Sequence, residues 1–224
     1  GSTLNILTAA ALTVISLSLF QEGEGSTLSW TLHLFAIALF VAAVYLLLPV
    51  KQWLPKPSIP WARWQSIALL LIVILGLGFR LYRFHDLPYG MWYDEADNGL
   101  SARQILRNPN YRPVYVASTN LPAHFLYLVA LSFRLLGDSM HAIRAVAVLL
   151  GTATIIAAYF FGYELFGPRR GRTMGLILAF LIAVSRWDVN WSRIGMHGVS
   201  LALFELRVVA ALLRALRTGR LTAF

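Results

Sequence analysis

Two neighbouring stretches decide how this chain folds: QSIALLLIVILGLGFRL at residues 65–81 and PYGMWYDEADNGLSARQIL at residues 88–106. The first is almost entirely apolar and is close to the roughly 20 residues that cross a bilayer. The second gathers acidic side chains directly behind Trp and Tyr rings, which prefer the membrane–water interface. We therefore expect the carboxylates of residues 88–106 to lie at a membrane surface, just after a membrane-spanning helix.

The composition indicates an integral membrane protein. Of the 224 residues, 58% are hydrophobic and 13% are charged. The net charge of +9 comes mostly from Lys and Arg in short loops between apolar segments, where such charges set membrane orientation, so we do not expect nucleic acid as a partner. The chain has no cysteine, which excludes disulfides, thiolate metal sites and Cys nucleophiles.

Hydropathy predicts an all-α, polytopic fold with six membrane-spanning helices. The expected spans are Leu4–Phe20, Ser29–Val50, Gln65–Leu81, Ala142–Phe166, Thr173–Val184 with its flanks, and Val199–Leu216. Gly171 and Gly175 form a GxxxG pair, which we interpret only as a sign of close helix packing.

The distribution of arginines decides the topology. Leu121–Gly137 is long enough to cross a membrane or to lie in the interface. If it crosses, the basic turn at residues 169–172 and the basic tail at 214–220 both face outward, against the positive-inside tendency. We therefore expect it to lie flat. Residues 82–141 then form one long outer loop with two surface helices, and the basic linker at 51–63 is cytoplasmic.

A second polar loop, SRWDVNWSRIGMHG at Ser185–Gly198, is then predicted on the same side of the membrane as the acidic stretch. The two loops can meet there. Arg193 in this loop, and Arg144 near the outer end of its span, suit a lipid phosphate because guanidinium groups form charge-assisted hydrogen bonds with it. Snorkelling of the two side chains to the interface explains the positions of Arg193 and Arg144 equally well. A residue such as His197 is more often plainly interfacial than a ligand.

The acidic stretch has two interpretations. If a helix begins at Asp94, then Asp94, Asp97 and Asn98 share one face, and Glu95 points about 100° away. Spacing alone favours an ordinary helix start, with Asp94 as N-cap and Asp97 as its partner. However, a cap needs only one carboxylate, and grouping three beside aromatic rings costs repulsion and desolvation. A surplus carboxylate can act as a general base or hold a metal ion.

A family resemblance rests on WYDEA at residues 92–96, NG at 98–99, a basic surface helix and the pattern G-x-S-x-x-x-I-R at residues 137–144. With these motifs, residues 65–220 resemble the amino-terminal half of a GT-C glycosyltransferase. They are most similar to the bacterial branch related to protein O-mannosyltransferases and lipid A aminoarabinose transferases.

The resemblance implies that a sugar moves, with inversion, from a polyprenyl-phosphate donor to a hydroxyl of a protein, lipid or glycan at the non-cytoplasmic face of the cell membrane. Asp94 would be the catalytic base, and Glu95 would orient or hold the acceptor or a metal. We assign no cofactor, and the resemblance leaves open whether a divalent metal ion is required. The residues expected at the donor phosphate or the substrate are Arg193, Arg144, Asn98, Asp97 and His197.

The chain also departs from the family pattern. His197 stands where many relatives have an acidic residue, which leaves Asp188 as a substitute carboxylate. We expect residues 1–50 to be two additional helices and residues 51–224 to be the amino-terminal part of the catalytic domain. Because relatives are much longer, we expect a truncated chain with little turnover of its own.

Two other classes stay open. A non-catalytic assembly or sugar-lipid binding protein would keep the aromatic and arginine residues but tolerate the loss of Asp94. A transporter would need ionisable residues near the middle of the bilayer, whereas the charges here fall mostly at the ends of spans.

Overall fold

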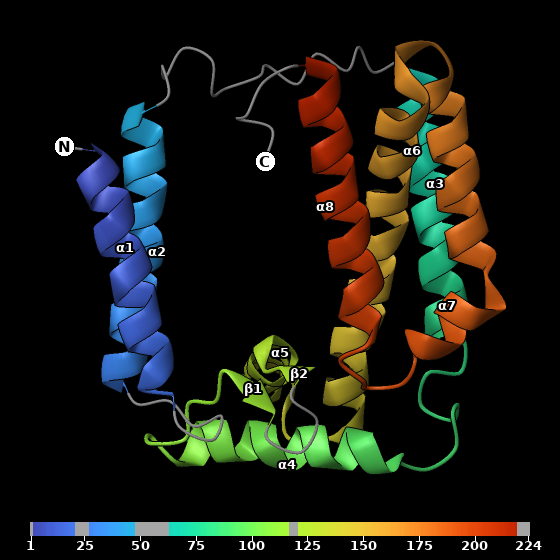
Figure 1. The fold of residues 1–224 in the computed structure, drawn as a ribbon. Coiled ribbons are helices and arrows are strands. Elements are labelled where there is room, and N and C mark those ends of the chain that lie inside the picture. The colour runs from blue at the N-terminus through green and yellow to red at the C-terminus, as the bar shows by residue number, and fades with distance from the viewer. Residues whose placement is uncertain (1, 21–26, 48–62, 117–120, 219–224) are drawn as a thin grey trace. The chain divides into compact units, whose positions relative to one another are not determined.

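The computed structural model describes residues 2–20, 27–47, 63–116 and 121–218, and these residues are mostly helical, as expected (Figure 1). The helices are α1 (Ser2–Ser18), α2 (Thr27–Leu47), α3 (Arg63–Leu81), α4 (Tyr93–Arg107), α5 (His124–Leu136), α6 (Met140–Val184), α7 (Arg186–Trp191) and α8 (Val199–Thr218). An antiparallel pair of short strands, β1 (Tyr115–Val116) and β2 (Leu121–Pro122), was not foreseen. Most of the basic linker at 51–63, and Arg220, lie outside the described residues.

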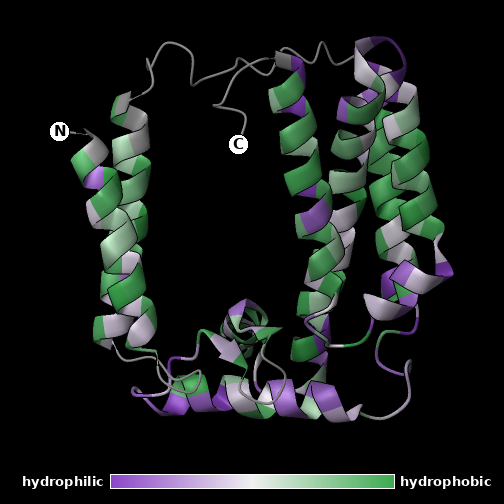
Figure 2. Ribbon diagram, viewed as in Figure 1, coloured by the Kyte–Doolittle hydropathy of each residue, from purple (hydrophilic) through white to green (hydrophobic). Residues whose placement is uncertain are grey.

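Two of the described helices, α3 and α6, are long and apolar enough to cross a membrane. Figure 2 shows hydrophobic residues along both of them and hydrophilic residues on α4. The stretches Leu4–Ser18, Thr27–Ala43 and His124–Leu136 are shorter apolar helices. These features fit a membrane protein, and the six spans stay a prediction.

The described residues cluster into two compact units. The first contains Gly1–Pro57 and Ala102–Tyr127, and the second contains Ser58–Ser101 and Leu128–Phe224. In the first unit, α1 packs along α2, and Ser16 Oγ lies 3.0 Å from His33 Nδ1. Trp30 Nε1 donates a hydrogen bond of 2.8 Å to the Arg112 carbonyl, which ties α2 to the segment before β1. The predicted domain boundary at residue 50 stays a prediction.

The second unit is a bundle of α3, α6 and α8. Helix α6 is a hairpin rather than one continuous helix, because Gly167 adopts φ 71° and ψ −177°. Glycine tolerates this left-handed φ, and Pro168 suits the first turn of the next helix because that turn needs no backbone donor. The first arm of α6 comprises residues 140–166 and the second arm residues 168–184. This reversal lies beside the basic turn at 169–172, where the sequence predicts that the chain turns back.

The two arms of α6 pack closely because glycines line the second arm. A Cβ on Gly171 would overlap the backbone of Tyr163, and a Cβ on Gly175 would fall against the Tyr159 carbonyl oxygen. The GxxxG pair therefore marks a close helix contact, as predicted. The core between these arms and α3 comprises Leu69, Ile155, Tyr159, Ala179 and Ala183.

The polar segments of the second unit gather at one end of this bundle. Here α3 ends, α6 and α8 begin, and α7 packs on α3 and α6. The amino-terminal half of α4 lies across this end (Figure 1). The long loop at 82–141 thus carries two helices, α4 and α5, as the sequence predicts, whereas α7 in the second loop was not foreseen.

We expect Gly175→Ala to destabilise the second unit by about 1–3 kcal/mol, because the added methyl group overpacks the contact with Tyr159. Thermal unfolding in detergent, followed by circular dichroism, measures the effect. Gly78→Ala is the matched control, since nothing lies within 4 Å of its added Cβ. That variant should be as stable as the parent or slightly more so. Equal changes in stability for the two substitutions would contradict a close contact between the two arms of α6 at Gly175.

Candidate functional site

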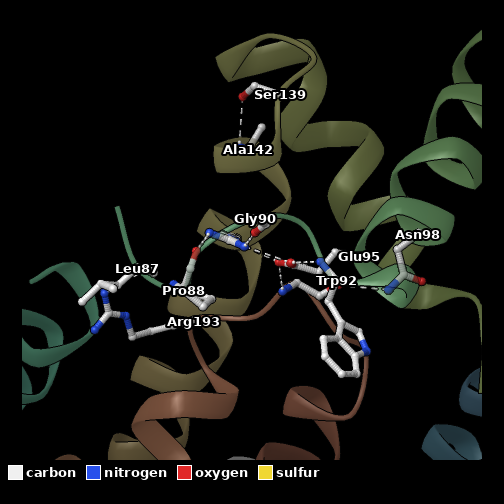
Figure 3. Close-up of polar contacts among 11 residues, drawn as sticks. Leu87, Pro88, Gly90, Trp92, Glu95, Asn98, Ser139, Ala142 and Arg193 are labelled. Atoms are coloured by element: carbon white, nitrogen blue, oxygen red, sulfur yellow. Dashed lines mark hydrogen bonds and ion pairs between the residues drawn. The ribbon is translucent and has the colours of Figure 1, made fainter. Parts of the chain in front are cut away.

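The site is built around a buried ion pair between α4 and α6. Arg144 Nε donates to Glu95 Oε1 at 2.9 Å, and Arg144 Nη2 donates to Glu95 Oε2 at 3.0 Å. Both side chains are only 1% exposed. Arg144 also donates to the carbonyl oxygens of Pro88 and Gly90 (Figure 3). One arginine therefore fixes both the start of α4 and the loop that leads into it.

The same carboxylate holds the second polar loop. The Gly195 N–H donates to Glu95 Oε1 at 2.7 Å, and Asn98 Nδ2 donates to the Gly195 carbonyl at 3.0 Å. Glu95 and Asn98 thus hold Gly195 from the same buried face of α4. The two loops, 100 residues apart at this contact, meet at one end of the bundle as the topology predicts.

The helix start differs from the expected one. Helix α4 begins at Tyr93, and the Trp92 N–H donates to Glu95 Oε2 at 3.0 Å (Figure 3). Glu95 is therefore the capping residue at the third helical position. The interpretation of Asp94 as N-cap with Asp97 as its partner is wrong. Asp94 and Asp97 are half-buried, whereas Glu95 is fully buried.

The hydrogen bonds of Glu95 bear on the role predicted for it, which stays a prediction. Its two oxygens accept four hydrogen bonds in all, from Arg144, Trp92 and Gly195. A carboxylate offers about four lone-pair sites, so none is left for an acceptor or a metal ion. Burial alone would raise the pKa of Glu95, but the hydrogen bonds from Arg144 and the two backbone N–H groups outweigh burial and hold the pKa below 4.5. In this structure, Glu95 holds α4, α6 and the second polar loop together.

The arginines are also largely engaged by the fold. Each of the three guanidinium nitrogens of Arg144 already donates within the fold, and phosphate binding by Arg144 stays a prediction. Arg193 Nη2 donates to the carbonyls of Tyr82 at 2.6 Å and Leu87 at 3.0 Å, which ties the second loop to the segment after α3. Because these contacts use only one nitrogen, phosphate binding by Arg193 stays a prediction.

His197 lies beside the two half-buried acids of α4. Burial lowers the pKa of His197, while the nearby charges of Asp94 and Asp97 act in the opposite direction. The histidine stands between Gly195, which α4 holds, and Val199, where α8 begins. His197 is therefore near enough to Asp94 and Asp97 for their charges to act on it, although the segments are far apart in the chain. Helix periodicity places Asp94 and Asp97 on one face, but it does not reveal this histidine neighbour.

A second buried ion pair, between Arg80 and Asp188, joins α3 to α7. Their side chains are 0% and 16% exposed, so Asp188 does not supply the free carboxylate for which we considered it. Gly151 makes room for the pair, because a Cβ there would overlap Ser192 and approach Arg80. We did not predict this contact, although an arginine in the last turn of an apolar helix signals a partner.

In the part of the chain that the structure describes, no group of three or more His, Asp or Glu side chains is placed to hold a metal ion. We therefore assign none of the described residues to the divalent metal ion that the sequence analysis leaves as an open question. The arrangement offers instead two carboxylates and an imidazole, which are groups able to accept or donate a proton.

Two helices long and apolar enough to cross a membrane, with a polar site at one end of the bundle, fit a membrane protein. Residues 120–224 match the family model of dolichyl-phosphate-mannose-protein mannosyltransferases. The resemblance seen in the sequence is thereby confirmed for this part of the chain, and glycosyltransferase is the general class of enzyme that it indicates. The match includes Arg144, Arg193 and His197 but not Asp94 or Glu95. Searches of curated proteins and of solved structures found no significant match.

We expect Glu95→Gln to lower the free energy of unfolding by about 3 kcal/mol or more at neutral pH, because it leaves Arg144 buried without its counter-charge. Since the pKa of Glu95 is lower in the folded state than its ordinary 4.5, its contribution is present above that pH and is lost as the pH falls below it. Melting curves between neutral and acidic pH test both statements. The variant should lose less stability than the parent on acidification.

Glu205→Gln is the control, because it removes the same charge from an exposed site on α8. It should leave the melting temperature and its pH dependence unchanged. If the Glu95 and Glu205 variants behaved alike, the ion pair would not organise this end of the bundle.

Proposed function

We propose that this protein is a membrane glycosyltransferase that moves a sugar from a polyprenyl-phosphate donor to an acceptor hydroxyl. The observation that carries the proposal is the buried ion pair of Glu95 and Arg144, which holds the start of α4, with the half-buried Asp94 and Asp97, against the loop that contains His197. The matched family supports the class of reaction, and its description names mannose as the sugar. Mannose is accordingly the first donor sugar to test.

Asp94 is the proposed general base. It is half-buried, belongs to the first turn of α4, and is separate from the capping bonds made by Glu95. Taking the proton from an acceptor hydroxyl makes its oxygen a better nucleophile, and a positioned base of this kind contributes roughly 10²–10⁴-fold. Attack on the anomeric carbon breaks the bond to the lipid phosphate in one displacement, so the sugar is transferred with inversion.

Arg193 is the proposed partner of the lipid phosphate. Negative charge builds on the phosphate as the sugar leaves, and a preorganised guanidinium stabilises that charge. The carbonyls of Tyr82 and Leu87 hold one edge of Arg193 in place. Asp97, Asn98 and His197 supply further polar contacts for the substrate, with Asn98 already engaged by Gly195.

The site is proposed to face the non-cytoplasmic side. The opposite end of the bundle carries a cluster of arginines at the turn of α6 and the end of α8, which are Arg169, Arg170, Arg172, Arg214 and Arg217. Positive charges of this kind favour the cytoplasmic side. The carboxylates of α4 lie at the other end, so a multi-pass arrangement would present them outside the cell membrane.

A sugar-lipid binding or assembly role is the second candidate. The exposed rings of Tyr89, Trp92 and Tyr93 favour it, because aromatic side chains can seat a membrane lipid without any chemistry. The two candidates differ in their need for Asp94.

We expect Asp94→Asn to reduce sugar transfer at least about 100-fold in membranes that contain the full-length protein, because asparagine cannot accept the proton. Transfer of radiolabelled mannose from a polyprenyl-phosphate donor measures the effect, and protease resistance reports on folding. Asp86→Asn is the matched control, since Asp86 is exposed and pairs only with Arg83 in the same segment. Unchanged transfer by the Asp94 variant would reject the assignment of the base and favour the binding role.

A further inference from the structure

A pair of buried charges fixes α7 to the end of α3. Arg80 lies in the last turn of α3, its side chain is fully buried, and two acceptors hold its guanidinium. Nη1 donates to the Gly76 carbonyl at 2.8 Å, and Nη2 pairs with Oδ2 of Asp188 in α7. Figure 1 shows α7 at this end of α3. Because a buried arginine is costly without a counter-charge, Asp188 keeps α7 in this place.

Two glycines leave the space that the ion pair needs. A Cβ on Gly76 would fall against Ile155 and lie 3.2 Å from Arg80 Nη1. A Cβ on Gly151, in the first arm of α6, would overlap Ser192 and lie 3.1 Å from Arg80 Nε. The guanidinium and the end of α7 therefore share one closely packed space, where a change in either displaces the other.

The backbone of α7 carries this constraint to Arg193. The Asp188 carbonyl accepts a hydrogen bond of 2.9 Å from the Ser192 N–H and a second one from the Ser192 hydroxyl. Arg193 follows directly, and its own N–H donates to the Asn190 carbonyl at 3.1 Å. The end of α7 thus holds the backbone of Arg193, and Asp188 links that end to α3.

The side chain of Arg193 is held on one edge only. Its Nη2 donates to the carbonyls of Tyr82 and Leu87, in the segment after α3 (Figure 3). Its Nε is buried, and no hydrogen-bond acceptor meets it among the residues that the structure describes. A buried donor without an acceptor is costly, and a bound anion would supply one. The position of this guanidinium therefore depends on α3 through both its backbone and its side chain.

We propose that Arg80 and Asp188 are positioning residues for the phosphate of the sugar-lipid donor, and that they act through Arg193. The inference rests on the proposed function, in which Arg193 stabilises that phosphate. Arg80 is fully buried, so it affects the donor only through the residues that it holds. The ion pair fixes the point at which Arg193 leaves α7. A guanidinium that is held in place before the donor binds loses little freedom on binding, which favours affinity for the phosphate.

Binding of undecaprenyl phosphate, which carries no sugar, to the full-length protein in detergent tests the proposal. Native mass spectrometry measures the bound fraction. We expect Asp188→Asn to weaken binding about tenfold, because small misplacements of a substrate-contacting group are costly. Arg193→Gln should weaken it at least as much, and the double variant should bind no worse than Arg193→Gln alone. Asp86→Asn is the matched control, since Asp86 pairs with Arg83 at an exposed site.

The transfer assay separates positioning from general damage to the fold. With a polyprenyl-phosphate mannose donor, Asp188→Asn should raise the KM for the donor about tenfold and leave the KM for the acceptor unchanged. Equal rises in both KM values, or a further loss of binding when Asp188→Asn is added to Arg193→Gln, would overturn the proposal. Unchanged binding by either single variant would also overturn it. If binding changed as expected but the parent transferred no sugar, the proposed function would fail while the role of the ion pair in phosphate binding stood.

A second variant keeps the test decisive if Asp188→Asn impairs folding. Gly151→Ala adds a methyl group that pushes against Ser192, so it shifts the end of α7 while both charges stay in place. It should weaken the binding of undecaprenyl phosphate in the parent but not in the Arg193→Gln variant. Gly78→Ala is the matched control, because nothing lies within 4 Å of its added Cβ. Equal binding by the two alanine variants would contradict the positioning role.

Discussion

The buried ion pair between Glu95 and Arg144 is the constraint on which this end of the molecule depends. Taking both charges out of water costs several kcal/mol per ion, and only good geometry and further hydrogen bonds offset that cost. Both conditions are met, because the pair is bidentate and Glu95 also accepts from the backbones of Trp92 and Gly195. One carboxylate thus holds together α4, α6 and the loop before α8.

This arrangement separates the structural acid from the acids available for chemistry. Glu95 and Asn98 point into the packed interior, whereas Asp94 and Asp97 stay half-buried on a neighbouring face of α4. The buried carboxylate of Glu95 fixes the backbone that carries Asp94, the proposed base. A general base held in this way meets its substrate with little reorganisation, which is how preorganised sites favour a transition state.

The sequence predicts the helices and the meeting of the two polar loops well, because hydropathy and arginine placement reflect strong physical constraints. It predicts the reversal near residue 169 from the basic turn, and the close contact at Gly175 from the GxxxG pair. It does not reveal which acid of the WYDEA motif is buried, since periodicity gives relative directions around a helix but not the side that packs. The partners of Arg144 and Arg80 are 49 and 108 residues away in the chain, so the spacing of residues in the sequence does not predict either ion pair.

The two ends of the bundle have different chemistry. One end carries carboxylates, an imidazole and aromatic rings, and the other carries arginines at the turn of α6 and the end of α8. The glycine contacts within α6 hold its two arms together between these ends.

A double-mutant cycle between Glu95 and Arg144 tests the central claim most directly. Free energies of unfolding are compared for the parent, Glu95→Leu, Arg144→Leu and the double variant, since leucine removes each charge and its hydrogen bonds. The structure predicts a coupling energy of about 2–3 kcal/mol, with the double variant more stable than the sum of the single losses allows. Additive losses, with a coupling energy near zero, would contradict the account.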